Sequence, residues 1–212
     1  MRITEAIIYK EKPFVIPDCS RDELPKFFKA MDYKVGAEIG VYKGNFIKTF
    51  CWQGLKMYGI DPWIPYGGGG NAYNNVESQE SLFNEASHKL RKFDCTLIRK
   101  TSRDALAHFI DNSLDFVYID GDHRFQYVAE DIVEWSKKVR SGGVVSGHDY
   151  RCVDLEINKL PLVKQLHRHV GLIVDAYIDA FQIENFYVFG QSRKLNKNSK
   201  NESFLSWMFI KK

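Results

Sequence analysis

The chain has 212 residues, of which 44% are hydrophobic and 27% are charged, and its formal net charge at pH 7 is +3. These are the proportions of a globular protein, and the length suits one domain with a full core rather than two. No apolar run approaches the roughly 20 residues of a membrane span, and a mild charge with interspersed signs gives no case for nucleic acid. We therefore expect a single domain over 1–212, with neither a membrane nor a nucleic-acid partner.

The N-terminal stretch and the cysteines bear on the compartment. Residues 1–10 carry an early acid and lack the long apolar core and small-residue cleavage site of a signal peptide. The cysteines are scattered and form no Cys-x-x-Cys pair, which favours reduced thiols over a disulfide frame or a zinc site. They are Cys19, Cys51, Cys95 and Cys152. Both features predict a cytoplasmic protein.

The first 34 residues precede the strongest strand pattern of the chain. Ser20 can cap a helix over 21–31, with Glu23 as its capping-box partner. We expect residues 1–34 to form an N-terminal cap on the domain, with a position over its site as one option.

The stretch Val35–Gly44 is an apolar strand pattern that runs into two glycines and then into a helical pattern over 45–52. Gly40 and Gly44 leave room where a strand ends and a helix opens, so that a bound group could approach free backbone N–H groups. The spacing is Gly-x-x-x-Gly, preceded by Glu38; it lacks the third glycine of a dinucleotide-binding turn and the Gly-Lys-Ser/Thr of a P-loop. The turn predicts a ligand site, although a strand, a glycine turn and a helix occur in any α/β protein.

A second strand pattern over 54–60 ends in Asp61. This acid lies about 20 residues past Gly40, the distance at which a carboxylate can accept both hydroxyls of a ribose. The alternative is a turn residue before Pro62. The next stretch, 65–75, holds four consecutive glycines; we interpret it as a mobile flap, with a passive surface loop as the alternative.

The densest group of polar residues follows a buried-type strand over 114–119. A helical pattern over 76–93, a strand pattern from residue 95 and a capped helix from residue 101 come before it. The strand delivers Asp120, Asp122 and His123 at its carboxyl end, and charges this close cost free energy unless something pairs with them. A helix over 126–139 and a further strand ending in His148 and Asp149 come next.

The last third of the chain predicts a short helix over 161–170 and two closing strands over 171–176 and 185–190. A Lys/Asn/Ser-rich stretch over 193–202 is typical of a solvated linker. The apolar segment 204–210 could dock on this domain or on a partner, so a homo-oligomer formed through the tail is open.

Strand and helix patterns alternate along the chain, which predicts a parallel sheet with helices on both faces. The expected fold is a Rossmann-like, doubly wound α/β fold with a mostly parallel seven-stranded sheet, comprising a cap (1–34), a core (35–190) and a tail (191–212). A ligand of such a sheet binds at the carboxyl ends of the strands where their order reverses. The strand ends that bear Gly40, Asp61, Asp120 and His148 should therefore converge.

Two segments in combination resemble the class I S-adenosylmethionine-dependent methyltransferases, in particular a branch of small O-methyltransferases. They are Ile119-Asp-Gly-Asp-His123 and Gly142-Gly-Val-Val-Ser-Gly-His-Asp-Tyr150, and the resemblance covers 35–150. It implies S-adenosylmethionine (SAM) as the cofactor and a hydroxylated small molecule or sugar as the acceptor. Asp61 would then hold the ribose, Ser102 and Arg103 the adenine, and Asp120 would lie beside the sulfonium. The implied cofactor-binding residues are Glu38, Gly40, Val41, Gly44, Asp61, Trp63, Ser102, Arg103 and Asp120.

Two versions of the chemistry stay open. In one, similar to metal-dependent O-methyltransferases, Asp120, His148 and Asp149 bind a divalent ion that lowers the pKa of the acceptor hydroxyl. The related enzymes usually present two oxygen ligands where this chain has His148 and Asp149. A histidine there disfavours Mg²⁺ and admits Mn²⁺, Fe²⁺ or Zn²⁺. In the other, His148 or His123 is the general base without a metal.

A structural hydrogen bond at a strand end is the alternative role for each histidine. The rival functions are a non-catalytic SAM-binding or interaction module and a dinucleotide-dependent oxidoreductase, the latter disfavoured by the missing third glycine.

Overall fold

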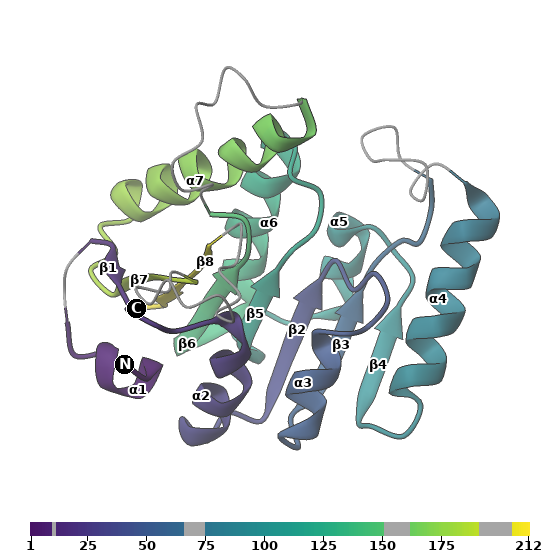
Figure 1. Cartoon of the computed structure of the whole chain (residues 1–212), viewed down its shortest axis with the longest axis horizontal. Helices are drawn as coiled ribbons and strands as arrows, with labels where there is room; N and C mark the ends of the chain where they lie inside the picture. Colours follow the sequence, from purple (N-terminus) through teal and green to yellow (C-terminus); the bar gives the residue numbers. More distant parts are fainter. Residues whose placement is uncertain (10–11, 66–74, 151–161, 191–204) are drawn as a thin grey trace, which may run out of the picture.

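The computed structural model describes residues 1–9, 12–65, 75–150, 162–190 and 205–212 (Figure 1). Helices and strands alternate over most of the chain, as the sequence predicts. In order they are α1 (Ile3–Ala6), β1 (Phe14–Val15), η1 (Arg21–Glu23), α2 (Leu24–Ala30), β2 (Val35–Ile39), α3 (Ile47–Trp52), β3 (Lys56–Ile60), α4 (Val76–Leu90), β4 (Cys95–Ile98), α5 (Ser102–Ala105), η3 (Leu106–His108), β5 (Leu114–Ile119), α6 (Phe125–Lys138), β6 (Val139–Gly147), α7 (Leu162–Ala180), β7 (Phe186–Phe189) and β8 (Ser206–Ile210). The expected flap (65–75) and linker (193–202) fall largely or wholly outside the described residues.

One sheet of eight strands runs through the molecule in the order β1-β7-β8-β6-β5-β2-β3-β4. All neighbouring strands are parallel except β8, which is antiparallel to both β6 and β7. From β2 the chain winds outward through β3 to β4 and then returns to the other side of β2 with β5. The order of the strands therefore reverses between β2 and β5, and the Rossmann-like α/β fold is confirmed.

The sheet differs from the expected seven strands at its C-terminal half. Residues 171–176, expected as a strand, lie inside α7, because the buried residues Val170, Ile173, Val174 and Ile178 recur at helical spacing while Leu172 faces solvent. The sequence left undecided whether the apolar segment 204–210 docks on this domain or on a partner. Its strand β8 lies in this sheet, between β6 and β7. The short edge strand β1 pairs with β7 and brings the number to eight.

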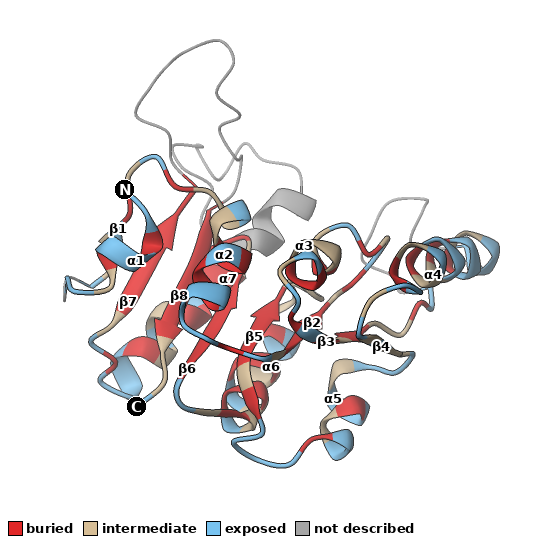
Figure 2. Cartoon of the chain, turned by 90° about the horizontal axis from the view of Figure 1, so that it is seen from below, coloured by how far each residue is buried: buried red, intermediate tan, exposed pale blue. Residues whose placement is uncertain are grey.

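The two faces of the sheet carry separate hydrophobic cores, and Figure 2 shows the buried strands between them. Residues of α1, α2, α3 and α4 pack on one face, around the ring contacts that Phe116 makes with Phe28 and Phe50. Residues of α5, α6 and α7 pack on the other face, where Trp135 contacts Phe109. A sheet buried on both faces explains why the strand patterns are nearly continuous runs of apolar residues. No helix in the described ranges is long and apolar enough to cross a bilayer.

The register of the central strands brings their carboxyl ends to one edge. Ile39 lies opposite both Ile60 and Ile119, and Ile119 lies opposite Gly147. The residues that follow, among them Gly40 and Asp120, therefore meet at this edge.

Gly40 has a φ of +89°, and a Cβ at this position would lie 2.1 Å from the carbonyl oxygen of Asp120. Only glycine combines this backbone conformation with so close an approach. The glycine that the sequence marks as the start of a ligand-binding turn thus also allows β2 and β5 to end side by side.

The first prediction concerns β8. Phe209 is 1% exposed in the core of the α6 face, so Phe209→Ala should lower the free energy of unfolding by about 3–5 kcal/mol. The matched control, Phe181→Ala, removes a ring that is 60% exposed and should cost less than about 1 kcal/mol. Urea denaturation measures both. Equal stability of the two variants would contradict the placement of β8 in the core.

The second prediction concerns the Gly40 turn. Gly40→Ala should lower the free energy of unfolding by at least about 2 kcal/mol, because strain at positive φ and overpacking against Asp120 act together. Gly121→Ala is the control, since a Cβ there would meet no atom closer than 3.6 Å. Thermal unfolding of the two variants gives the comparison; a Gly40→Ala variant as stable as the control would rule out the close contact.

Candidate active site

A cavity of about 550 Å³ opens at the carboxyl edge of β2, β3 and β5. This is the size of a pocket that holds a cofactor or a drug-sized molecule. Most of the residues predicted for the site line it, together with others from the loops after β3 and β5 and from α6. The predicted residues in the lining are Gly40, Asp61, Trp63, Ser102, Arg103, Asp120 and His123.

Three of the predicted cofactor residues are not in this lining. Val41 is buried in the core of the α3 face, and Gly44, at a φ of +71°, lies against α4, where a Cβ would stand 3.1 Å from the side chain of Leu90. Glu38 points into the same face and is 2% exposed. Burial, and then the charge of Asp120, raise the pKa of Glu38 well above its usual range. Its Oε2 has no hydrogen-bond partner among the described residues, so this carboxyl carries an unused polar atom beside the site.

Asp61 ties the Gly40 turn to the end of β3. Its Oδ2 accepts from the backbone N–H of Tyr42 at 2.9 Å, and its Oδ1 accepts from the backbone N–H of Trp63 at 2.8 Å. The indole of Trp63 donates to the carbonyl of Tyr42 at 2.9 Å. Burial raises the pKa of Asp61, although the backbone N–H groups of Tyr42, Trp63 and Val41 act in the opposite direction. Each carboxylate oxygen keeps a second lone pair, so the turn-residue role and a ligand-binding role are compatible.

Ser102 begins α5 and is held by α6. Its hydroxyl accepts from the indole Nε1 of Trp135 at 2.7 Å and donates to Asp131 Oδ1. Arg103 lines the cavity from the surface, where its Nε lies 3.2 Å from Glu130 and its side chain is 77% exposed. The loop after β4 therefore presents one fixed hydroxyl and one solvated cation.

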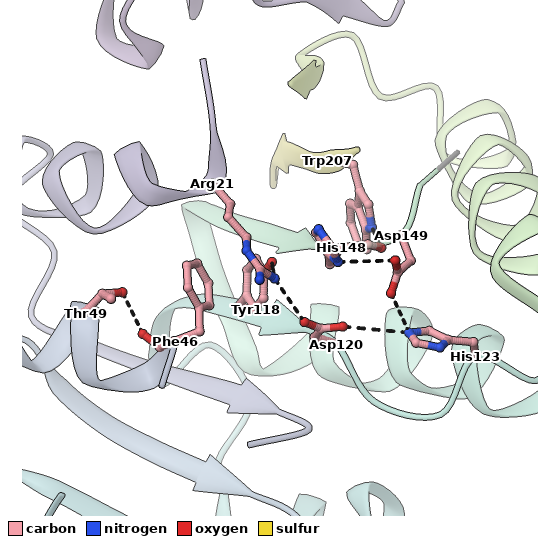
Figure 3. Close-up of polar contacts among 9 residues, drawn as sticks. All are labelled: Arg21, Phe46, Thr49, Tyr118, Asp120, His123, His148, Asp149 and Trp207. Carbon is pink, nitrogen blue, oxygen red and sulfur yellow. Dashed lines mark hydrogen bonds and ion pairs between the residues drawn. The ribbon is translucent and has the colours of Figure 1, made fainter. Parts of the chain in front are cut away.

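Acids and histidines from the ends of β5 and β6 form a chain of contacts (Figure 3). His123 Nε2 lies 3.7 Å from Asp120 Oδ1 and 2.8 Å from Asp149 Oδ2. His148 Nδ1 lies 3.3 Å from the other oxygen of Asp149. Donor atoms of Asp120, His123 and Asp149 all lie within 4.8 Å of one another, whereas His148 is not part of this group.

One imidazole nitrogen with two carboxylates is a donor set that fits Mn²⁺, Fe²⁺ or Zn²⁺ better than Mg²⁺. The structure thus brings together two of the three predicted metal ligands, with His123 where the sequence suggested His148.

The carboxylates favour the charged form of both imidazoles. Burial lowers the pKa of His123, but the hydrogen bonds and charges of Asp120 and Asp149 outweigh it and raise this pKa to about 10. Burial likewise lowers the pKa of His148, and Asp149 reverses the effect, so that this pKa is also raised. An imidazolium has no lone pair with which to accept a proton. At a pKa of about 10 His123 is an imidazolium near neutral pH, and the role of either histidine as a metal-free general base stays a prediction.

Arg21 reaches the same cluster from the N-terminal cap, as Figure 3 shows. Its Nη1 lies 3.4 Å from Asp120 Oδ2 and 3.4 Å from the hydroxyl of Tyr118, and its guanidinium lies over the ring of Phe46 at 4.9 Å. Sequence reasoning missed this residue, because 99 positions separate it from Asp120 and no local pattern links the two. This contact supports a position of residues 1–34 over the site, which the sequence left as one option.

The family model described as a methyltransferase domain matches residues 37–150. No curated protein matches the sequence.

Several solved structures share the fold. A protein from Staphylococcus aureus provisionally assigned as a caffeoyl-CoA O-methyltransferase has a TM-score of 0.64 at 12% identity, over 89% of this chain and 81% of that one. An O-methyltransferase from Bacillus cereus in complex with S-adenosylhomocysteine (SAH) has a TM-score of 0.59 at 16% identity, over 92% of this chain and 83% of that one. An O-methyltransferase from Streptomyces achromogenes that is involved in tomaymycin synthesis, in complex with SAM, has a TM-score of 0.57 at 12% identity, over 90% of this chain and 79% of that one.

The matched range extends from β2 to the residue after Asp149, and so contains every strand end that forms the cavity. It spans more than half of the chain, and it nearly coincides with the range of the resemblance drawn from the sequence. The protein is therefore an enzyme of the methyltransferase-domain family.

Proposed function

We propose that this methyltransferase transfers the methyl group of SAM to a hydroxyl group of a small molecule. The observation that carries the proposal is the convergence of Gly40, Asp61, Ser102 and Asp120 on one cavity at the switch point of the sheet. The O-methyltransferases of similar fold, two of them in complex with SAM or SAH, support the cofactor and the oxygen acceptor.

The chain offers a place for each part of the cofactor. Asp61, fixed by two backbone N–H groups, would accept hydrogen bonds from the ribose hydroxyls through its remaining lone pairs. The hydroxyl-bearing end of the cavity at Ser102 would take the adenine. Asp120 would lie beside the sulfonium and favour its positive charge, and the methionine part would approach the Gly40 turn.

Methyl transfer is an in-line displacement, so the enzyme must align the acceptor and help to remove its proton, while the leaving thioether needs no acid. Asp120, His123 and Asp149 are the residues that would hold a divalent ion. Such an ion supplies a lowered pKa for an acceptor hydroxyl that binds to it. The two carboxylates would also orient that hydroxyl, and Arg21 beside Asp120 would limit the access of water from the side of the cap.

Loss of the Asp61 charge tests the ribose assignment. Asp61→Asn should weaken SAH binding about 10- to 100-fold, because hydrogen bonds to an ionised acceptor are lost. Asp111→Asn is the control, since Asp111 is 58% exposed and pairs with Lys138 on the surface. Isothermal titration calorimetry measures both variants. Unchanged SAH affinity in Asp61→Asn would refute the assignment.

Substitution of each histidine distinguishes the two candidate ligand sets, one with His123 and one with His148. His123→Ala should weaken Mn²⁺ binding by at least about tenfold, whereas His148→Ala should have the smaller effect because its imidazole lies beyond Asp149. Asp122→Asn is a control on the same loop, since Asp122 pairs with Arg124. Calorimetric titration with Mn²⁺ gives the affinities, and circular dichroism verifies the fold. A large loss in His148→Ala with none in His123→Ala would restore the ligand set predicted from the sequence.

A further inference from the structure

Two cysteines that the methyl transfer does not use lie in the same part of the core. Cys51, near the C-terminal end of α3, is 6% exposed, and Cys95, the first residue of β4, is partly buried. Cys51 belongs to the hydrophobic core between α1–α4 and the sheet, and Cys95 packs against that core. Both thiols are free, so their chemistry depends on how close they are.

The packing of α3 on the sheet explains why the two residues meet. A Cβ on Gly59 would lie 2.8 Å from the side chain of Leu97 in β4 and 3.0 Å from that of Ile47 in α3, so these two side chains face each other. Cys95 precedes Leu97 by two positions and shares its face of the sheet, and Cys51 follows Ile47 by one helical turn. Because α3 carries the chain back from the end of β2 to the start of β3, both steps lead toward the amino end of β4, by about 6–7 Å each. Cys51 therefore lies over Cys95.

The contact between the thiols makes them unequal. A hydrogen bond from the Cys51 thiol lowers the pKa of Cys95, and the same bond raises the pKa of Cys51. Cys95 is also the more accessible of the two, since β4 is the edge strand of the sheet (Figure 1). The thiolate is the nucleophilic form of cysteine, so Cys95 is the thiol that an oxidant meets first, and Cys51 is the thiol placed to attack the product.

We propose that Cys95 and Cys51 form a site of reversible oxidation by hydroperoxides, which ends in a disulfide between α3 and β4. In the first step the Cys95 thiolate attacks one peroxide oxygen: an S–O bond forms, the O–O bond breaks, and the other oxygen leaves as hydroxide, which a solvent proton converts to water. In the second step the Cys51 sulfur attacks the sulfenic sulfur of Cys95: the S–S bond forms, the S–O bond breaks, and the leaving hydroxide takes the Cys51 proton. The two sulfurs lose two electrons in total, and the peroxide gains them.

Peptide mapping of peroxide-treated protein tests the inference. The folded protein is treated with an equimolar amount of hydrogen peroxide, alkylated under denaturing conditions and digested with trypsin, whose cleavage sites place the two cysteines on separate peptides, 49–56 and 93–99. We expect the two peptides to be joined, to weigh two hydrogen atoms less than the reduced peptides together, and to separate on treatment with dithiothreitol. Two separate alkylated peptides, or a link from Cys95 to another cysteine, would overturn the inference.

Two variants test the order of the steps. In Cys51→Ala the joined peptides should be lost and Cys95 should accumulate as sulfinic or sulfonic acid, because the thiol that resolves the sulfenic acid is missing. In Cys95→Ala the buried Cys51 should stay reduced. Oxidised Cys51 in Cys95→Ala, with unreacted Cys95 in Cys51→Ala, contradicts the proposed order.

The remaining controls lie within the same samples. Cys19, which is 4% exposed, should be alkylated in every sample, as expected for a buried thiol outside the pair. Circular dichroism verifies the fold of each variant. The wild-type peptide map decides whether the disulfide forms even if one of the variants does not fold.

Discussion

The contact between Gly40 and the backbone of Asp120 is the constraint on which the site depends. A side chain at Gly40 would lie 2.1 Å from the carbonyl oxygen of Asp120, so the turn after β2 and the loop after β5 can lie this close only with glycine there. Because Ile39 is in register with both Ile60 and Ile119, the same edge also receives the end of β3. One missing side chain thus allows the loops after three strands to enclose a single cavity.

Charge is concentrated at this edge and balanced from several segments. Asp120 lies between the guanidinium of Arg21 and the imidazole of His123, and Asp149 lies between the two imidazoles. Carboxylates this close and this buried repel one another unless cations lie among them. The protein meets this requirement with two imidazoles of raised pKa and one arginine, and a divalent ion would meet it in the same place. Arg21 therefore makes the N-terminal segment electrostatically part of the site.

The C-terminal strand also positions the site from behind. Trp207 in β8 is fully buried, and its indole donates to the carbonyl of His148 at 3.2 Å. A Cβ on Gly147 would lie 2.7 Å from the Trp207 ring, so β6 and β8 are closely packed just before the turn. Asp149 then adopts a φ of +57°, and its Oδ2 lies 2.8 Å from His123 Nε2. Strand β8 thus contacts the backbone at the turn that carries His148 and Asp149.

The sequence by itself determined the α/β class, the Gly40 turn, and the acids at the ends of β3, β5 and β6, because apolar runs, glycines and strand-end carboxylates are local patterns and parallel strands end at one edge. The burial of Asp131 could also have been predicted, since helical spacing places it between Val128 and Trp135. Tertiary structure alone decided that β8 completes the sheet, that α7 takes the place of an expected strand, that Arg21 reaches Asp120, and that His123 rather than His148 groups with both Asp120 and Asp149. Each of these depends on contacts between segments far apart in the chain, and the free energy of such contacts is not encoded in any one segment.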